Sequence, residues 1–264
     1  ATFSVDLYEF DQCGIVGGYP SLCTGTTWIR SFPGAPLERS FIRVISHTVQ
    51  VAISNLTNQI CGDTVFLVSG NEGYAHWPIE VLAKFRSIEN SQLNKKSSKI
   101  IVPPSLNNWQ EESLELIGYP SENVCQFDEI DQSVFDTVII PSTSELLWTG
   151  PPYVSPQELK WIRRQVLSEI DEPHTQHGKR LFVSRADADK RNIINQDTVA
   201  DLLSQFGVNM IIPGNLSYSE QVAAFSNAEL IIGPHGAGLT NIIYSENATV
   251  IELLIEDIKN KHYY

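Results

Sequence analysis

The chain has 264 residues, of which 42% are hydrophobic and 19% are charged. This composition is sufficient for a buried core, fits two modest domains and excludes compositional disorder. The formal net charge of -13 makes nucleic acid and anionic membrane surfaces unsuitable partners. A few arginines that converge on one point would still bind an anion locally.

The cysteines and the apolar runs bear on the compartment of the protein. Cys13, Cys23, Cys61 and Cys125 form no C-x-x-C pair and no zinc-like spacing with histidines, so we expect reduced thiols. No apolar run reaches the ~18–20 residues that cross a bilayer, and the first residues do not resemble a signal peptide. These features favour a cytoplasmic protein without a transmembrane segment, and self-association of the chain stays open.

The first half of the sequence changes character near Thr64. Residues 1–60 contain short β-rich segments such as residues 41–53, which predict an N-terminal β-rich extension. Residues 61–150 alternate apolar strands with helical patterns, which predicts a Rossmann-like domain with a parallel sheet. The expected strands are residues 64–69, 99–103, 122–127 and 136–141, and the expected helices are residues 74–88 and 109–119, the latter ending at Gly118.

A proline-rich stretch, residues 141–156, marks the expected domain boundary. The second domain, residues 151–264, begins with a helix at 156–170 and then repeats the α/β pattern more regularly. We expect strands at residues 180–185, 208–213, 229–234 and 249–255, and helices at residues 196–207, 217–228 and 236–244. Short strand–helix alternation predicts a doubly wound parallel sheet. Such a domain normally has one more helix, so we expect the sequence to be truncated.

The strongest chemical signal is the glycine-rich segment 231–241, which connects a buried strand to a helix. Gly236 and Gly238 allow close approach of the backbone, and the N–H groups of a helix start favour a phosphate or diphosphate. The glycine spacing fits neither a dinucleotide fingerprint nor a Walker loop. A hydrolase oxyanion loop would require a G-x-S-x-G elbow, which the sequence lacks. The alternative is a tight turn without a ligand.

Two arginines strengthen the phosphate interpretation. Arg185 follows one expected strand and Arg191 lies six residues further, and ligands of open α/β sheets bind beyond the carboxyl ends of the strands. Guanidinium groups bind phosphate oxygens in bidentate fashion. The alternative is a surface arginine or a salt bridge to Asp187 or Asp189. These two aspartates form a D-x-D pattern, but an arginine pair would neutralise the diphosphate, so we expect no metal site.

A third candidate pair is His76 and Glu80. Their spacing of four places both on one face of the expected helix, just beyond the strand that starts at Thr64. Either side chain is a suitable general base for an acceptor hydroxyl. The alternatives are a histidine satisfied beneath a loop and a solvated glutamate.

The run from Leu181 to Leu254, with its paired arginines and glycine loop, resembles glycosyltransferase family 61. That family includes plant xylosyl- and arabinosyltransferases, the EGF-domain O-GlcNAc transferase and bacterial capsular polysaccharide biosynthesis proteins, and the resemblance covers about residues 64–255. It implies a GT-B fold with two Rossmann-like domains. It also implies an inverting, metal-independent transfer from a UDP-sugar co-substrate to a glycan or other acceptor, with no cofactor, in capsular or surface polysaccharide synthesis.

The resemblance also implies roles for individual residues. Arg185 and Arg191 match the arginines expected to hold the diphosphate, and His76, Trp77 and Glu80 match an H-W-x-x-D pattern with Glu for Asp. The implied diphosphate loop comprises His235, Gly236, Ala237 and Gly238, and the implied nucleotide or sugar contacts are Asn195, Asn241 and Glu252. The second hypothesis is a non-catalytic nucleotide- or sugar-binding module of the same fold.

Overall fold

The computed structural model describes five ranges in full and the backbone of five further strands. The ranges are residues 73–89, 98–102, 105–126, 154–170 and 175–254, and the strands are Leu7–Ile15, Ser21–Thr24, Thr27–Arg30, Asn58–Phe66 and Ser133–Pro141. The chain divides into two units. Unit 1 comprises residues 1–72 and 76–162, and unit 2 comprises residues 73–75 and 163–264.

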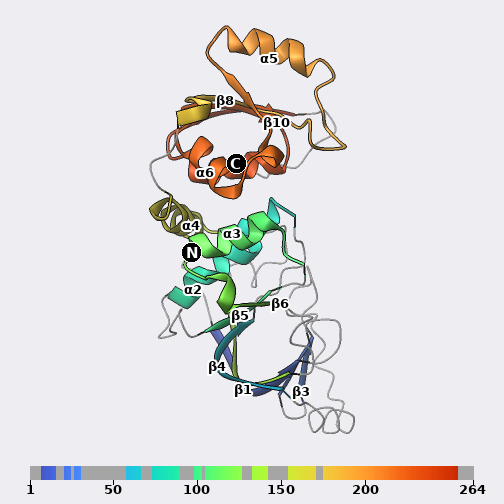
Figure 1. Cartoon of the computed structure of the whole chain (residues 1–264), viewed down its shortest axis with the longest axis vertical. Coiled ribbons are helices and arrows are strands. Elements are labelled where there is room, and N and C mark those ends of the chain that lie inside the picture. The colour runs from blue at the N-terminus through green and yellow to red at the C-terminus, as the bar shows by residue number, and fades with distance from the viewer. Residues whose placement is uncertain are drawn as a thin grey trace. The chain divides into compact units, whose positions relative to one another are not determined.

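Unit 1 contains a mixed sheet in which seven described strands lie in the order β3-β2-β1-β7-β4-β5-β6 (Figure 1). They are β1 (Leu7–Ile15), β2 (Ser21–Thr24), β3 (Thr27–Arg30), β4 (Asn58–Phe66), β5 (Lys99–Val102), β6 (Val124–Gln126) and β7 (Ser133–Pro141). Strands β7, β4, β5 and β6 run parallel, as their continuous apolar pattern predicts. β1 joins the same sheet antiparallel to β7, and β2 and β3 continue from it as a meander.

Helical segments connect or follow the parallel strands of unit 1, as the sequence pattern predicts. They are the π-helical turn η2 (Trp77–Val81), the 3-10 turns η3 (Leu82–Lys84) and η4 (Ser121–Asn123), and the α-helices α2 (Phe85–Glu89), α3 (Asn108–Leu116) and α4 (Pro156–Ser168). Helix α3 ends before Gly118, whose φ of 91° lies in the left-handed region that glycine adopts without strain. The boundary between the two units falls within α4.

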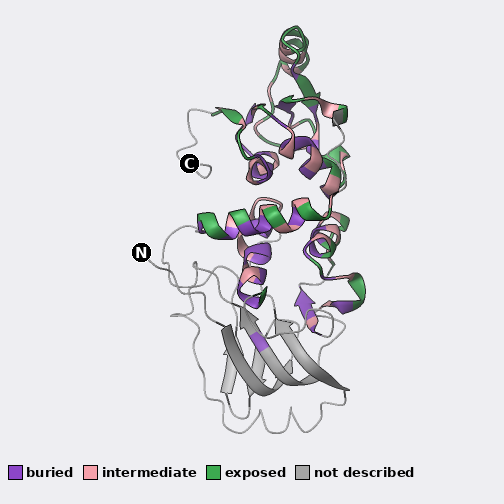
Figure 2. Ribbon diagram, turned by 90° about the vertical axis from the view of Figure 1, so that its left-hand side faces the viewer, coloured by how far each residue is buried: buried purple, intermediate pink, exposed green. Residues whose placement is uncertain are grey.

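Unit 2 contains a four-stranded parallel sheet in the order β11-β10-β8-β9. Its elements are β8 (Arg180–Val183), β9 (Asn209–Ile211), β10 (Leu230–Pro234), β11 (Thr249–Leu253), α5 (Gln196–Ser204), α6 (Tyr218–Ser226) and the 3-10 helices η7 (Thr175–His177), η8 (Pro213–Asn215) and η9 (Ala237–Tyr244). Helices α5 and α6 lie on opposite sides of the sheet (Figures 1 and 2), which confirms the expected doubly wound α/β arrangement of this unit.

The strand order of unit 2 defines a topological switch point between β8 and β10. From β8 the chain passes outward to β9, whereas from β10 it passes outward to β11 on the other side. Crossovers that diverge in this way leave a crevice beyond the carboxyl ends of the two central strands. The residues that follow Val183 and Pro234 therefore lie at the edge where ligands of open α/β sheets bind.

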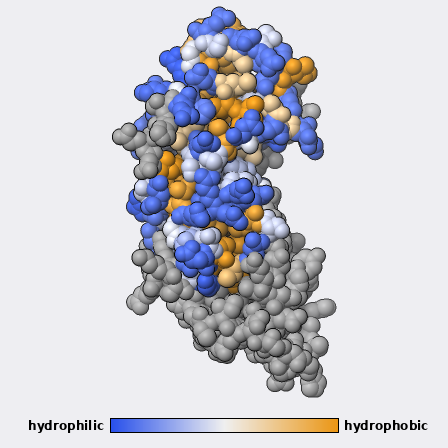
Figure 3. Space-filling view, viewed as in Figure 1, coloured by the Kyte–Doolittle hydropathy of each residue, from blue (hydrophilic) through white to orange (hydrophobic). Residues whose placement is uncertain are grey.

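The two faces of unit 2 are packed unequally (Figure 2). Leu181, Phe182 and Ile231 of the sheet are fully buried, and Val222 and Phe225 of α6 are buried with them. Helix α5 has no buried residue. Apolar side chains therefore reach the surface in this unit (Figure 3), among them Ile194, Leu202, Phe206 and Met210.

Three details qualify the sequence predictions. The helix expected at residues 236–244 is a 3-10 helix, and Gly238 with the β-branched Thr240, Ile242 and Ile243 explains its weak α-helical preference. The strands expected within residues 41–53 and most of the proline-rich stretch lie outside the described residues. Within the described part of the chain, no helix is long and apolar enough to span a bilayer.

Helix α6 offers a direct test of local stability. The Ser217 hydroxyl accepts a hydrogen bond from the Glu220 amide at 3.1 Å, and the Glu220 carboxylate accepts one from the Ser217 amide at 2.7 Å. This reciprocal pair satisfies two amides at the helix start. We expect Ser217→Ala to lower the free energy of unfolding by about 1 kcal/mol, measured by urea denaturation. Ser217→Asp keeps an acceptor and should stay close to wild type, and an equal loss in both variants would contradict the capping account.

Candidate active site

The structure brings Arg185 and the glycine loop together at the switch point of unit 2. A Cβ atom placed on Gly236 would lie 1.7 Å from Nη1 of Arg185 and 2.6 Å from its Cζ. The guanidinium therefore occupies the space that any other side chain at position 236 would fill. The φ of Gly236 is 167°, which is extended backbone open to every residue, so the glycine is needed for space and not for conformation.

The same loop presents the first amides of a helix. The first backbone bond of η9 runs from Leu239 N to Gly236 O at 3.0 Å, so the amides of Ala237 and Gly238 precede the helix hydrogen bonds. A Cβ on Gly238 would lie 3.2 Å from Pro213 Cγ and 3.3 Å from Val183 Cγ1, which keeps the loop close to the end of β8. A guanidinium beside amides at a helix start is a favourable environment for an anion.

Ser184 and Gln196, which the sequence analysis did not assign to the site, fix the turn that carries Arg185. Ser184 is buried, and its hydroxyl donates to Gln196 Oε1 at 2.7 Å and accepts from the Ala186 amide at 3.0 Å. Arg185 Nε donates to the carbonyl of Lys190 at 3.2 Å. The guanidinium is thus held in position before any ligand binds. The only sequence signal for this support is the short serine side chain directly after an apolar strand.

Arg191 is placed differently from Arg185. Its φ of 62° puts a non-glycine residue in the left-handed region, which costs free energy and is uncommon outside turns and functional loops. Its side chain forms no hydrogen bond or ion pair with the residues that the structure describes. Nearby, Asp187 accepts a hydrogen bond from the Gly214 amide at 2.9 Å, so this carboxylate of the D-x-D pattern connects the arginine loop, residues 184–195, to η8.

His235 and Glu252 form a buried pair on neighbouring strands of unit 2. His235 Nδ1 donates to Glu252 Oε1 at 2.6 Å, and the two side chains are only 8% and 5% exposed. The His235 amide also donates to the carbonyl of Leu253 at 3.0 Å, which extends the pairing of β10 with β11 by one residue. Glu252 therefore orients His235, the residue that begins the glycine loop. The contact also gives the buried Glu252 carboxylate a partner within unit 2.

The two asparagines predicted to contact the donor have unlike environments. Asn241 is 1% exposed, and its Nδ2 donates to Gln221 Oε1 at 2.9 Å. Its Oδ1 accepts a hydrogen bond from the hydroxyl of Tyr74 at 2.8 Å. Asn195 is exposed at the start of α5. Asn241 thus has partners at both ends of its amide, whereas Asn195 lies on the surface beyond the arginine loop.

In unit 1, His76 and Glu80 lie on one side of a helical turn, as their spacing predicts, and they are hydrogen-bonded to each other. His76 Nδ1 donates to Glu80 Oε1 at 2.5 Å, and the side chains are 37% and 14% exposed. Both lie on the π-helical turn η2 and its cap, and such turns are frequent at functional sites. Trp77 anchors the turn, because its buried indole donates to Ser113 Oγ at 2.8 Å and meets Trp109 edge-on at 5.9 Å.

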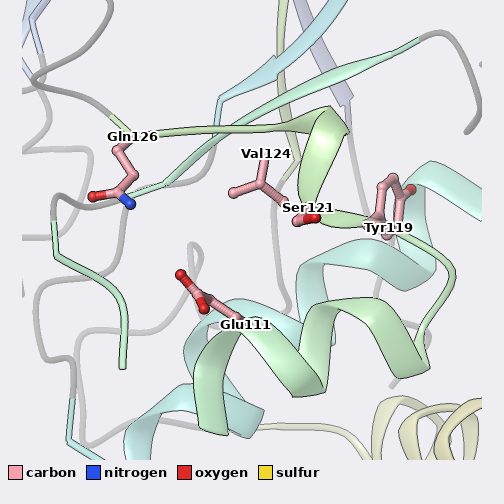
Figure 4. Close-up of a pocket in the computed structure, with 5 residues that line it drawn as sticks. All are labelled: Glu111, Tyr119, Ser121, Val124 and Gln126. Carbon is pink, nitrogen blue, oxygen red and sulfur yellow. The ribbon is translucent and has the colours of Figure 1, made fainter. Parts of the chain in front are cut away.

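A separate pocket in unit 1 contains none of the predicted site residues. It is lined by Glu111, Tyr119, Ser121, Val124 and Gln126, with Glu111 projecting from α3 toward the β6 side of the pocket (Figure 4). Burial raises the pKa of Tyr119, and the charge of Glu89 raises it further, so this phenol stays protonated at neutral pH. Among the described residues, no group of three histidine, cysteine or acidic side chains has the arrangement of a metal site.

The arrangement in unit 2 defines the class of protein. A doubly wound sheet with an arginine and a glycine loop at its switch point is the architecture that α/β proteins use for phosphorylated ligands. The family model of glycosyltransferase 61 matches residues 74–251, and the chain belongs to that family. The match includes His76, Glu80, Arg185 and the glycine loop, and it ends one residue before Glu252.

One curated relative gives the comparison more detail. A β-1,2-xylosyltransferase from Arabidopsis thaliana is 28% identical over an alignment of 104 residues, and the match covers 34% of this chain and 18% of that protein. The matched part therefore spans less than a fifth of the length of the plant enzyme.

The His235–Glu252 pair yields a stability prediction. Glu252→Ala removes the carboxylate that accepts from a buried imidazole, and we expect a loss of about 1–3 kcal/mol in the free energy of unfolding. Glu252→Gln keeps an acceptor and should lose less. Tryptophan fluorescence during urea unfolding measures both. Glu246→Ala, an exposed acidic residue on the preceding loop, is the control, and a loss equal to that of Glu252→Ala would contradict the role of the pair.

Proposed function

We propose that the chain carries the donor and base residues of an inverting glycosyltransferase that moves a sugar from a UDP-sugar to a hydroxyl of a glycan or other acceptor. The observation that carries the proposal is the contact of the Arg185 guanidinium with Gly236 at the switch point of unit 2. It places a fixed positive charge beside the amides of η9. Membership of glycosyltransferase family 61 supplies the reaction class.

The Arg185 guanidinium and the first amides of η9 together suit the diphosphate of the donor. UDP leaves with more negative charge than it has in the intact donor, so groups fixed around the diphosphate stabilise the transition state more than the ground state. Arg185 supplies the charge, and Ala237 and Gly238 supply amides that point along the start of η9. In this proposal Arg191, on the same loop as Arg185, approaches when the donor binds. These groups take the part that a divalent metal plays in other transferases, so the proposal includes metal independence.

The His76–Glu80 pair supplies the base. Glu80 accepts the Nδ1–H of His76 and leaves Nε2 as the atom that takes the proton of the acceptor hydroxyl. The acceptor oxygen attacks C1 of the sugar on the face opposite UDP, so the new C1–O bond forms as the bond to the diphosphate breaks. The anomeric configuration is therefore inverted. Glu80 stabilises the imidazolium that forms on proton transfer.

The finer assignments rest on the family resemblance and on the relative. A GT-B arrangement, a cytoplasmic location and a role in capsular or surface polysaccharide synthesis belong to the proposal. A pentosyl donor such as UDP-xylose is the first substrate to test, because the relative is a β-1,2-xylosyltransferase. Asn195 and Glu252 are assigned to the nucleotide or sugar side of the donor, and Asn241, whose amide is buried and already hydrogen-bonded, supports the glycine loop.

Removal of the guanidinium tests donor binding. A hydrogen bond to a charged group contributes about 1.5–3 kcal/mol, so Arg185→Ala should weaken UDP binding roughly 10- to 150-fold in isothermal titration with EDTA present. Gly236→Ala, which displaces the guanidinium without a change of charge, should weaken it similarly. The control is Arg180→Ala at the amino end of the same strand, where the guanidinium donates to the Phe206 carbonyl. Equal UDP affinity in Arg185→Ala and Arg180→Ala would contradict the proposal.

Removal of the base tests catalysis separately from binding. We expect His76→Ala to lower kcat for sugar transfer by about 10²–10⁴-fold, with the Kd for UDP unchanged, because a general base acts only in the transition state. Glu80→Gln should give a smaller loss, and His177→Ala serves as the control. A wild-type chain that binds UDP but neither transfers nor hydrolyses any donor would instead support a non-catalytic binding module.

A further inference from the structure

Residues 73–75 belong to unit 2, although the residues on both sides of them along the chain belong to unit 1. Tyr74 makes the specific contacts of this short segment. Its hydroxyl donates to Asn241 Oδ1 at 2.8 Å, and its ring lies 6.3 Å from the ring of Tyr218 at an interplanar angle of 57°. The segment therefore binds to the rest of unit 2 through the side chain of Tyr74.

The partner of Tyr74 is held from two further directions. Asn241 Nδ2 donates to Gln221 Oε1 on α6 at 2.9 Å and approaches the Gly238 carbonyl at 3.4 Å. Both partners of Nδ2 are acceptors, so the amide orientation is fixed and Oδ1 faces the tyrosine hydroxyl. Asn241 and Gln221 are 1% and 4% exposed, so this polar chain is shielded from water. A buried, mutually satisfied network of this kind holds a single geometry.

The aromatic residues that contact Tyr74 are equally constrained. Tyr218 meets Tyr244 edge-on with ring centroids 6.0 Å apart, and their hydroxyls are hydrogen-bonded to each other. Both rings are at most 1% exposed. Burial raises the pKa of Tyr244, with a further contribution from Tyr74, so the phenol keeps its proton at neutral pH. Helices α6 and η9 thus form a rigid receptor for Tyr74.

The segment that α6 and η9 hold lies next to His76 in the sequence. Asn241 lies on η9, the helix whose first residues form the glycine loop. Two peptide units join Tyr74 to His76, and chain geometry limits the separation of their Cα atoms to about 7 Å. A contact that holds Tyr74 therefore restrains the backbone that leads into His76.

We propose that Tyr74, Asn241 and Gln221 form a clip that holds residues 73–75 and restrains the backbone that leads into His76, with Tyr74 as a positioning residue for sugar transfer. This inference rests on the proposed function. A restrained backbone limits the movement of the base before the acceptor binds, which matters because a displacement of about 1 Å can cost 10²-fold in rate. Asn241 then acts through its contacts with Tyr74 and Gln221.

Tyr74→Phe tests the clip, because it removes the hydroxyl and keeps the ring against Tyr218. We expect hydrogen exchange of the backbone over residues 73–82 to rise, with or without UDP. We expect kcat for transfer to fall about tenfold, while KM for the donor and Kd for UDP stay within twofold. The matched control is Tyr119→Phe in unit 1, whose ring packs on Phe85 and which should leave all four quantities unchanged.

Each outcome separates one part of the inference. Exchange over residues 73–82 that equals wild type in Tyr74→Phe overturns the clip. Increased exchange with an unchanged kcat in Tyr74→Phe overturns the positioning role of Tyr74. A change in KM for the donor without a change in kcat also overturns that role. A wild-type chain that neither binds UDP nor transfers sugar overturns the proposed function, and the exchange measurement still reports on the clip independently of that failure.

Discussion

The site depends on one close approach, that of the Arg185 guanidinium to the backbone of Gly236. No side chain fits at position 236 while the arginine is there, because even a methyl group would overlap Nη1. The contact joins the ends of two parallel strands and puts a permanent positive charge at the start of η9. The glycine is thus required by the arginine, and the two residues form one functional element.

The fold produces this contact through strand order and local support. β8 and β10 are neighbours although β9 and the helices α5, η8 and α6 separate them in sequence. The chain diverges from β8 and β10 in opposite directions. Ser184 fixes the turn after β8, whereas the His235–Glu252 pair fixes the turn after β10. The two turns are therefore rigid at the point where they meet. Rigidity of this kind lowers the reorganisation that binding of a diphosphate would require.

The local features of this fold could be predicted from the sequence. A few adjacent residues are enough to predict the apolar strands, the serine cap of α6 and the helix ends at Gly118 and Gly207. The structure confirms these features. Arg185 and the glycine loop were predicted to meet because both follow strands of one parallel sheet. The His76–Glu80 pair followed from a spacing of four.

Features that depend on distant partners could not be predicted in the same way. The antiparallel pairing of β1 with β7 joins segments more than a hundred residues apart, and no local pattern encodes it. The bond between Tyr74 and Asn241 spans 167 residues and joins two polar side chains of common types. The 3-10 form of η9 and the left-handed backbone of Arg191 depend on packing around the loop, which outweighs weak local preferences.

The central claim is that a diphosphate binds where Arg185 meets the glycine loop. The most direct measurement is a titration of glycine-labelled protein with UDP in EDTA, followed by the amide nitrogen and proton shifts. The account predicts saturable shifts at Gly236 and Gly238, with Gly178 and Gly207 unchanged because both precede the amino ends of strands in the same sheet. Saturable shifts confined to other glycines, or none at millimolar UDP, would contradict it.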